Sequence, residues 1–357
     1  MANAVNVGGL TLNPQEAQSV SEFIMARTIM SPALQSYATI YNGIKMNTQV
    51  VIAGNMGMSG LKSANCGRQS SGAESVLSEK FLNPVNVSDT FAMCGDDIDG
   101  EFKPFKNKVQ SYKDLYDFEG SDIALLLAAK IEGSIVEAVD RLIWASDVDM
   151  EEATSSTSGV VPSSPADFYT KFYTPTDGVW KQIVEDSTIE RFTITKNAQT
   201  TVANQALAAG ESVTIFNAVI KNAKTQLRQS LDKQLLVSRD VFDNYVDYLI
   251  SKGENNSIQY TVDGIASVKY KGIPVINMEG AWISFETILQ NTTSGVQLDP
   301  HKVILTTPSN IAVGTLQESG IKELDTHFDW LTKKTYIAYG FTVNAIVVEA
   351  DMISVAY

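Results

Sequence analysis

The sequence predicts an α+β fold in which one long helix accompanies many short strands. Two observations indicate this. An apolar residue recurs at every fourth position from Ile123 to Ile143, and glycine-punctuated, β-prone pieces fill residues 45–113. The first pattern gives a helix one apolar face, and the second favours short strands joined by turns. At 357 residues the chain can also bury a sizeable core.

Composition narrows the classes of function. With 41 acidic and 27 basic residues the net charge is -14, so a surface that neutralises many phosphates is not expected. Cys66 and Cys94 are the only cysteines, too few for a disulfide framework or a four-thiolate zinc site. The sequence shows neither a signal peptide nor a run of about 18 apolar residues. We expect a soluble protein with no membrane partner.

The first 43 residues carry few charges and few periodic apolar positions. We therefore expect an extended arm with a short helix, which adds little to the core of its own subunit. Exposed apolar groups on such an arm mark a surface that binds another chain. Four residues of the arm are candidates for contact with a neighbouring subunit: Phe23, Ile24, Met25 and Tyr37.

Residues 44–112 are predicted to form a long, mostly β excursion, with strands near residues 48–53 and 84–87. Glycine-rich, weakly apolar strands of this kind lack a core of their own, and a two-stranded hairpin is only marginally stable in water. We expect the excursion to pack mainly on a neighbouring subunit.

A single amphipathic helix is predicted from about Asp122 to Ser146. At 1.5 Å per residue it is roughly 35 to 40 Å long, enough to form the spine of a subunit. Residues 151–165, rich in serine and threonine, are expected to follow as a loop. The apolar face of the helix contains five regularly spaced residues: Ile123, Leu127, Ile131, Ile135 and Val139.

The second half of the chain alternates predicted helices and strands. One helix is expected over residues 213–231, and another begins after Ser238 and ends at Gly253. Strands are expected at residues 234–237, 266–270, 273–277, 302–306 and 335–350. Turns are expected at Lys271-Gly272 and at Asp299-Pro300, with a turn or bulge at Gly340.

Residues suited to catalysis are scarce. The two histidines, His301 and His327, have no partners at a spacing that would build a catalytic site. Residues 57–63 lack the spacing of a phosphate-binding loop. Residues 96–100 resemble the start of a calcium loop, but Lys106 stands where the bidentate glutamate is required. We therefore expect no catalytic residue, no cofactor and no metal, and a chain that is not an enzyme.

Residues 102–108 combine aromatic and basic side chains. Such a segment is able to touch nucleic acid, but acidic residues flank it on both sides, which favours a solvated or subunit-facing strand. Phe102 and Phe105 complete the candidates for subunit contact. The aromatic and basic positions of the segment are Phe102, Lys103, Phe105, Lys106 and Lys108.

The order of these elements resembles the major capsid proteins of tailed bacteriophages with the Hong Kong 97 fold. The resemblance covers essentially the whole chain and depends on the order of short landmarks. Cys66 and Cys94, on either side of residues 80–90, are similar to those in capsid proteins of phages that infect Bacteroidetes. The landmarks are Thr176–Trp180, Lys271–Ile276, His301–Asn310 and the terminal β-prone stretch.

The resemblance implies four parts: an N-terminal arm (1–43), an extended loop or E-loop (44–112), a peripheral or P domain (113–178 and 320–357) and an axial or A domain (179–319). It implies no N-terminal scaffolding domain, since no long charged coiled segment precedes the arm.

The resemblance also implies a function and partners. The chain would be a major capsid protein that self-assembles, as hexamers and pentamers, into the icosahedral shell of the virion around the phage genome. Portal, scaffolding and decoration proteins would be further partners, and double-stranded DNA would be enclosed without sequence-specific binding. The alternatives are an encapsulin-like compartment shell, or another phage structural protein such as a tail or decoration protein.

Overall fold

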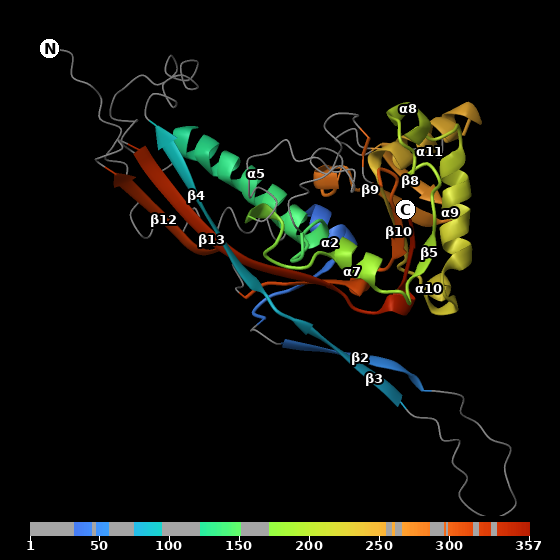
Figure 1. Ribbon diagram of the computed structural model, residues 1–357, viewed down its shortest axis with the longest axis horizontal. Coiled ribbons are helices and arrows are strands. Elements are labelled where there is room, and N and C mark those ends of the chain that lie inside the picture. Colours follow the sequence, from blue (N-terminus) through green and yellow to red (C-terminus); the bar gives the residue numbers. More distant parts are fainter. Residues whose placement is uncertain are drawn as a thin grey trace, which may run out of the picture.

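The computed structural model consists of two sheets, a long helix and a projecting two-stranded ribbon (Figure 1). The structure describes residues 32–44, 48–56, 75–94, 122–150, 171–254, 259–260, 266–285, 296–297, 299–316, 321–329 and 334–357.

The predicted spine helix is present. Helix α5 (Asp122–Trp144) runs without interruption for 23 residues. It ends two residues before the predicted end, and the hydroxyl of Ser146 donates a hydrogen bond to the carbonyl oxygen of Leu142 at 2.5 Å. In the half of α5 whose side chains are described, the apolar face is buried as predicted: Ile135, Val139, Leu142 and Ile143 are at most 2% exposed.

The sheet beside α5 is built around one long strand, β13 (Lys334–Val347). Strand β4 (Val85–Cys94) pairs with it antiparallel from Val343 back to Lys334. Strands β12 (Ile321–Asp329) and β11 (Ile311–Gly314) also pair with β13, and β1 (Thr39–Tyr41) adds to β11 in parallel. Alternate residues of β13 point to α5 and join its core: Tyr339, Phe341, Val343, Ala345 and Val347.

The sequence predicts a turn or a bulge at Gly340. Strand β13 runs through Gly340 without turning, so the predicted turn is wrong. The register irregularity lies instead in the partner strand β12, between Ile321 and Glu323, directly opposite Phe341 and Gly340. The extra residue of a bulge is accommodated by the strand that carries it. The glycine in the partner strand β13 therefore indicates the bulge in β12 only indirectly.

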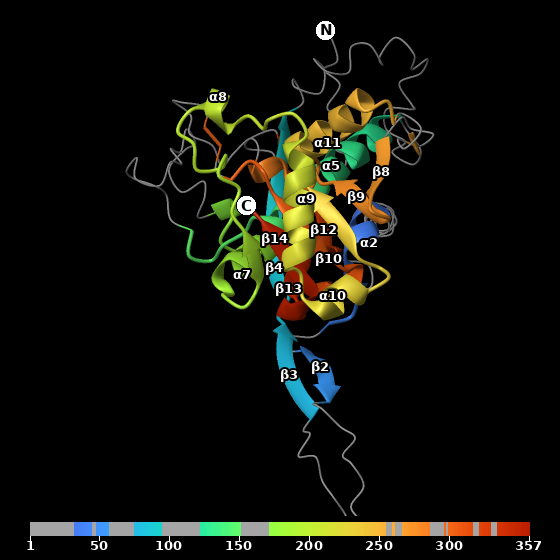
Figure 2. The same ribbon diagram turned by 90° about the vertical axis from the view of Figure 1, so that its right-hand side faces the viewer.

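The second sheet has seven strands in the order β5-β14-β10-β6-β9-β8-β7. Helices α9 (Glu211–Asn222) and α11 (Arg239–Ser251) contact each other and cover one face (Figure 2). The strands are β5 (Glu190–Phe192), β6 (Gln234–Val237), β7 (Gln259–Tyr260), β8 (Ala266–Tyr270), β9 (Ile273–Asn277), β10 (Val303–Thr306) and β14 (Ile353–Ala356).

The alternation of side chains along β6 divides the core into two layers. Leu235 and Val237 face α9 and α11. Leu236 faces the opposite layer, where it shares a core with α5. All three side chains are fully buried. A strand with both faces covered is apolar at every position, which explains the unbroken apolar run at these residues.

The predicted helix over residues 213–231 is two helices. Helix α9 ends at Asn222, and the backbone of Ala223 and Lys224 is extended before α10 (Thr225–Gln229) begins. The last position of the predicted apolar face, Leu231, lies outside both helices and is 95% exposed. The spacing of apolar residues by three and four positions continues across the break between α9 and α10 by coincidence.

Other local predictions for the second half are confirmed. Helix α11 begins after Ser238, and Gly253 follows its end with φ of 73°. Strands β8 and β9 form a hairpin whose turn residues Lys271 and Gly272 both have positive φ, 49° and 80°, as a two-residue hairpin turn requires.

The end of the predicted N-terminal arm belongs to the subunit core. Helix α2 (Pro32–Tyr37) packs against α5, with Leu34 and Tyr37 only 2% and 3% exposed. The next residues form β1 in the sheet. The expectation that residues up to Gly43 add little to the core is therefore wrong for this part of the arm. The remainder of the arm, residues 1–31, lies outside the described residues.

Candidate functional site

The predicted E-loop begins as a two-stranded ribbon of β2 (Thr48–Met56) and β3 (Ser75–Leu82). It projects away from the two sheets (Figures 1 and 2). Among the described residues these strands form a separate two-stranded sheet. A ribbon of this kind has little stability unless a third element covers it. Its root therefore decides how it is held to its own subunit.

One leucine anchors this root. Leu82 is fully buried on the face of the sheet opposite α5, in a small cluster with Ala312 and Ile346. Gly314 lies beneath it: a Cβ added there would lie 3.2 Å from Leu82 Cδ2. The absence of a side chain at position 314 leaves the space that Leu82 fills.

Two hydrogen bonds supplement the leucine. The ammonium of Lys80 donates to the carbonyl oxygen of Val347 at 2.6 Å, and the backbone N–H of Asn83 donates to Asn344 Oδ1 at 3.3 Å. Burial lowers the pKa of Lys80, and the charge of Asp186 partly opposes that shift. The root is thus a compact joint between the E-loop and the end of β13.

Tyr37 is the one predicted subunit-contact residue whose side chain is described. Its hydroxyl donates to Asp140 Oδ1 at 3.2 Å, and its ring lies 5.7 Å from that of Trp144. Because it is buried against its own spine helix, it has almost no surface left for a neighbour in this arrangement. The physical reason is that α2, at the end of the predicted arm, packs against α5 of its own subunit. Phe23, Ile24, Met25, Phe102 and Phe105 lie outside the described residues.

A lysine with several acidic neighbours joins the end of the spine helix to the first helix of the predicted A domain, α7 (Val179–Glu185). The Lys181 ammonium is 2.6 Å from Asp147, 2.6 Å from Asp149 and 2.9 Å from Asp177. These hydrogen bonds raise the pKa of Lys181 above its usual range, against the effect of burial. The contacts hold together segments on both sides of the predicted boundary at residue 178.

A second connection uses an amide side chain. Gln182 donates to the carbonyl oxygen of Ala345 at 2.8 Å and accepts from the N–H of Val347 at 3.0 Å. Both partners lie in β13 beyond the last residue paired with β4. The Gln182 side chain therefore continues the pairing of β13 and fixes α7 against it.

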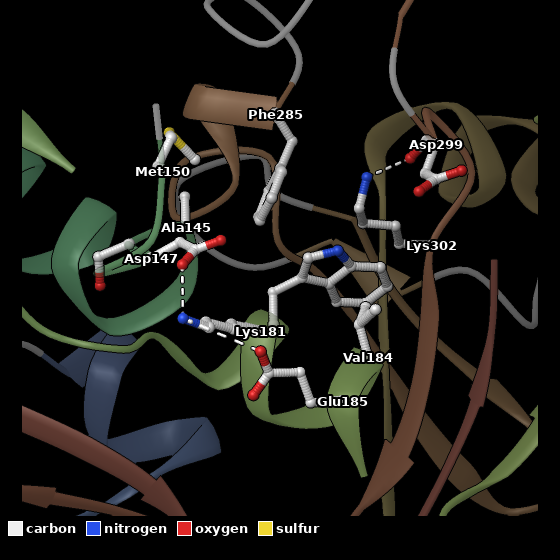
Figure 3. A pocket seen from close by; sticks show the side chains of 11 residues that line it. Ala145, Asp147, Met150, Lys181, Val184, Glu185, Phe285, Asp299 and Lys302 are labelled. Atoms are coloured by element: carbon white, nitrogen blue, oxygen red, sulfur yellow. Dashed lines mark hydrogen bonds and ion pairs between the residues drawn. The ribbon is translucent and has the colours of Figure 1, made fainter. Parts of the chain in front are cut away.

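A pocket of about 300 Å³ lies at this junction (Figure 3). Lys302 is 2% exposed, with its ammonium 4.5 Å from the ring centre of Phe285 and 5.1 Å from that of Trp180. That ammonium also donates to the carbonyl oxygen of Asp299. Its buried charge is thus held by aromatic rings and a carbonyl. The apolar lining comes from Ala145, Met150, Trp180, Val184 and Phe285.

His301 belongs to a structural network. Its ring contacts the Asp240 carboxylate through Nδ1, and Nε2 lies 2.6 Å from the carbonyl oxygen of Gln205. Asn197 exchanges two hydrogen bonds with its backbone, at 3.0 and 3.1 Å. The network fixes α8 (Val202–Gln205) to the start of β10. His327 lies in β12, but its side chain is outside the described residues.

No helix in the described part of the chain is long and apolar enough to cross a membrane. Within the same ranges, no group of three or more histidine, cysteine, aspartate or glutamate side chains is placed to hold a metal ion.

Comparison with known proteins gives a match in structure only. Neither a protein-family model nor a curated protein matches the chain. A chain of the satellite phage P4 procapsid, solved with its size determination protein, is similar with a TM-score of 0.52 and 8% identity, over 94% of this chain and 98% of that chain. The chain therefore has the Hong Kong 97-type capsid fold predicted from its sequence.

Two further solved structures are similar at lower scores. One is the capsid of a native GTA particle, with a TM-score of 0.48 and 11% identity over 91% of this chain and 89% of that chain. Another is an encapsulin complex from Synechococcus elongatus, with a TM-score of 0.45 and 8% identity over 92% of this chain and 88% of that chain.

Proposed function

We propose that this chain is the major capsid protein of a tailed bacteriophage, which self-assembles as hexamers and pentamers into the icosahedral shell of the virion. The observation that supports this best is the fold shared with the satellite phage P4 procapsid chain, end to end on both chains. The subunit also has the form that a lattice needs. A two-layered body carries a ribbon that reaches beyond it (Figure 1), and such projections supply contact area that a compact domain lacks.

The proposed role is structural and not enzymatic. The most elaborate arrangements of charged groups, around Lys181 and His301, connect segments of the subunit to each other. The net charge of -14 suits a container for DNA, because an acidic wall limits adhesion of the packaged duplex. Portal, scaffolding and decoration proteins are the further partners that this role would require.

The test is assembly of the purified chain. Sedimentation should separate a fast particle fraction from free subunits, and negative-stain images should show closed icosahedral shells. A chain that stays monomeric under all assembly conditions, with and without co-expressed phage proteins, would contradict the proposal.

Particle contents distinguish the alternative, an encapsulin-like compartment shell. Particles isolated from infected cells should contain nuclease-protected double-stranded DNA and carry tails. Tailless particles that contain a protein cargo in place of DNA would favour the compartment shell. A tail or decoration protein would instead bind to shells made by another chain.

A further inference from the structure

The pocket at the junction of α5 and α7 combines apolar walls and one buried cation, Lys302, with an acidic mouth (Figure 3). Val184 lines it and is 40% exposed, so the pocket opens to the surface. Asp147 and Glu185 lie at the same mouth, and the Glu185 side chain is 66% exposed. With Asp149 and Asp177, four carboxylates surround the single ammonium of Lys181. An occupant of matching chemistry would insert an apolar group and present positive charge to the mouth.

The chain itself contains a segment of this chemistry. Residues 102–108 read Phe-Lys-Pro-Phe-Lys-Asn-Lys, with two aromatic rings among three lysines. An aromatic side chain fits a cavity of about 300 Å³, and aromatic side chains are the usual anchors of protein interfaces. The lysines would then face the acidic mouth, where opposite charges favour the correct docking orientation.

Chain length favours a second copy as the source of this segment. Strand β4 ends at Cys94 and α5 begins at Asp122, both at the end of the molecule remote from the pocket (Figure 1). The pocket lies at the far end of α5, roughly 35 Å away for a helix of 23 residues. Phe102 lies eight positions after Cys94, and this stretch spans at most about 29 Å. The ring of either phenylalanine would therefore reach the pocket of its own chain only if most of the connecting residues were extended.

We propose that this pocket receives the 102–108 segment of a second copy of the chain, with a phenylalanine inside and lysines at the mouth. The inference rests on the proposed capsid function and adds a specific contact to it. It also assigns a role to the aromatic and basic segment and to Phe102 and Phe105. The contact would lie at the joint between the spine helix and the A domain, and would stiffen that joint on assembly.

Engineered cysteines test the contact in assembled shells. In a chain with Cys66→Ser and Cys94→Ser, we would add Val184→Cys in the pocket and Asn107→Cys within the docking segment. This keeps both phenylalanines and all three lysines. Mild oxidation should give a ladder of cross-linked chains on a non-reducing gel, from shells but not from free subunits. The control replaces Val184→Cys by Val202→Cys, an exposed position on α8, and should give no ladder.

Several results would overturn the contact while leaving the capsid function intact. Shells without a ladder, or with a disulfide inside single chains, would show that the second-copy contact is absent. A ladder of equal strength in the Val202→Cys control would show that the cross-link is not specific to the pocket.

A second variant needs no cysteine. Shells of Phe105→Ala, Phe102→Ala protein should dissociate at a lower denaturant concentration than unmodified shells, with subunit folding unchanged. Equal resistance of the two kinds of shell would also overturn the contact.

Discussion

Two leucines with the same burial hold very different parts of the molecule. Leu236 lies in β6, in the middle of the seven-stranded sheet, and Leu82 lies at the root of the E-loop; both are fully buried. Leu236 belongs to a large core that extends across α5, α7 and both sheets. Leu82 belongs to a cluster of three buried residues. Burial alone therefore does not indicate what a side chain stabilises.

The difference in the size of the two clusters indicates that the body and the β2–β3 ribbon are stabilised in different ways. Both faces of the seven-stranded sheet are covered by its own chain, so the body is able to fold by itself. The β2–β3 ribbon has one anchored end, and in the described part of the chain no further strand pairs with it. The sequence-based prediction that residues 44–112 pack mainly on a neighbouring subunit is wrong for β4, which pairs with β13 of its own chain. It stays a prediction for the β2–β3 ribbon, where the comparison of the two leucines gives a way to test it.

The largest effect is expected for Leu236→Ala. Removing a fully buried leucine leaves a cavity that surrounding strands cannot close, which costs about 2 to 5 kcal/mol of unfolding free energy. Denaturant unfolding of the unassembled subunit measures this, and the transition should stay cooperative. Leu231→Ala is the matched control, since its side chain is 95% exposed. An unchanged unfolding midpoint for Leu236→Ala would show that the two layers do not share one cooperative core.

A smaller effect on folding, but a large one on assembly, is expected for Leu82→Ala. Leu82 contacts few residues of the body, so opening should be local and the loss of subunit stability should be smaller than that of Leu236→Ala. Hydrogen exchange should accelerate in β2 and β3 but not in β6. Particle yield by sedimentation should fall. A stability loss as large as that of Leu236→Ala, with normal assembly, would reverse the assignment of the two leucines.

Sequence periodicity predicted the parts that pack on themselves. The four-residue repeat of α5 and the apolar runs of β6 and β10 each arise from the burial of a regular element, so these elements could be predicted without a structure. The root of the E-loop was not. Leu82 is one apolar residue in a short strand, and its partners Ala312 and Ile346 are more than 200 positions away in the sequence.

The same limit applies to the junction of the two domains. The spacing of Asp177, Lys181 and Glu185 by four residues was visible in the sequence, but Asp147 and Asp149 join them only because α5 ends there. Tyr37 was predicted to face a neighbour because the arm lacks periodicity. A helix of six residues is too short to show a period, and it was enough to bury this side chain.

A moderate effect is expected for Lys181→Met, which leaves the carboxylates around it without their cation. Because most of these carboxylates are solvent-exposed, the loss of unfolding free energy should be about 1 kcal/mol. Hydrogen bonds from Val148 and Lys181 hold the pKa of Asp177 below its usual value, in spite of partial burial. A depressed carboxyl pKa stabilises the fold at neutral pH, and this contribution is lost as the pH falls through it.

The difference in stability between unmodified and Lys181→Met protein should therefore be largest at neutral pH and low salt. It should shrink below about pH 4, where carboxylates become protonated, and in high salt. Lys221→Met removes the same charge from an exposed position on α9 and should have almost no effect. A difference that is independent of both pH and salt would mean that Lys181 acts through packing and not through its charge.

An effect of opposite sign is expected for Asp140→Asn. Burial raises the pKa of Asp140 to about 6, the charge of Glu137 adds to this, and the hydrogen bond from Tyr37 opposes it. A raised carboxyl pKa favours the fold below the unfolded value near 4, and this contribution is lost as the pH rises through 6. Asparagine stays neutral and its Oδ1 is able to accept the same hydrogen bond.

Asp140→Asn should therefore stabilise the subunit by about 1 to 2 kcal/mol at pH 7, and the advantage should vanish near pH 4. Unfolding midpoints across this range measure it, and Glu137→Gln, which breaks an ion pair with Arg141 at 2.7 Å, is the control expected to destabilise. If Asp140→Asn is less stable than unmodified protein at every pH, the charged carboxylate is what holds Tyr37. In that case α2 depends on an ionic contact with the spine helix, and the body of the subunit is less self-sufficient than its two-layered core suggests.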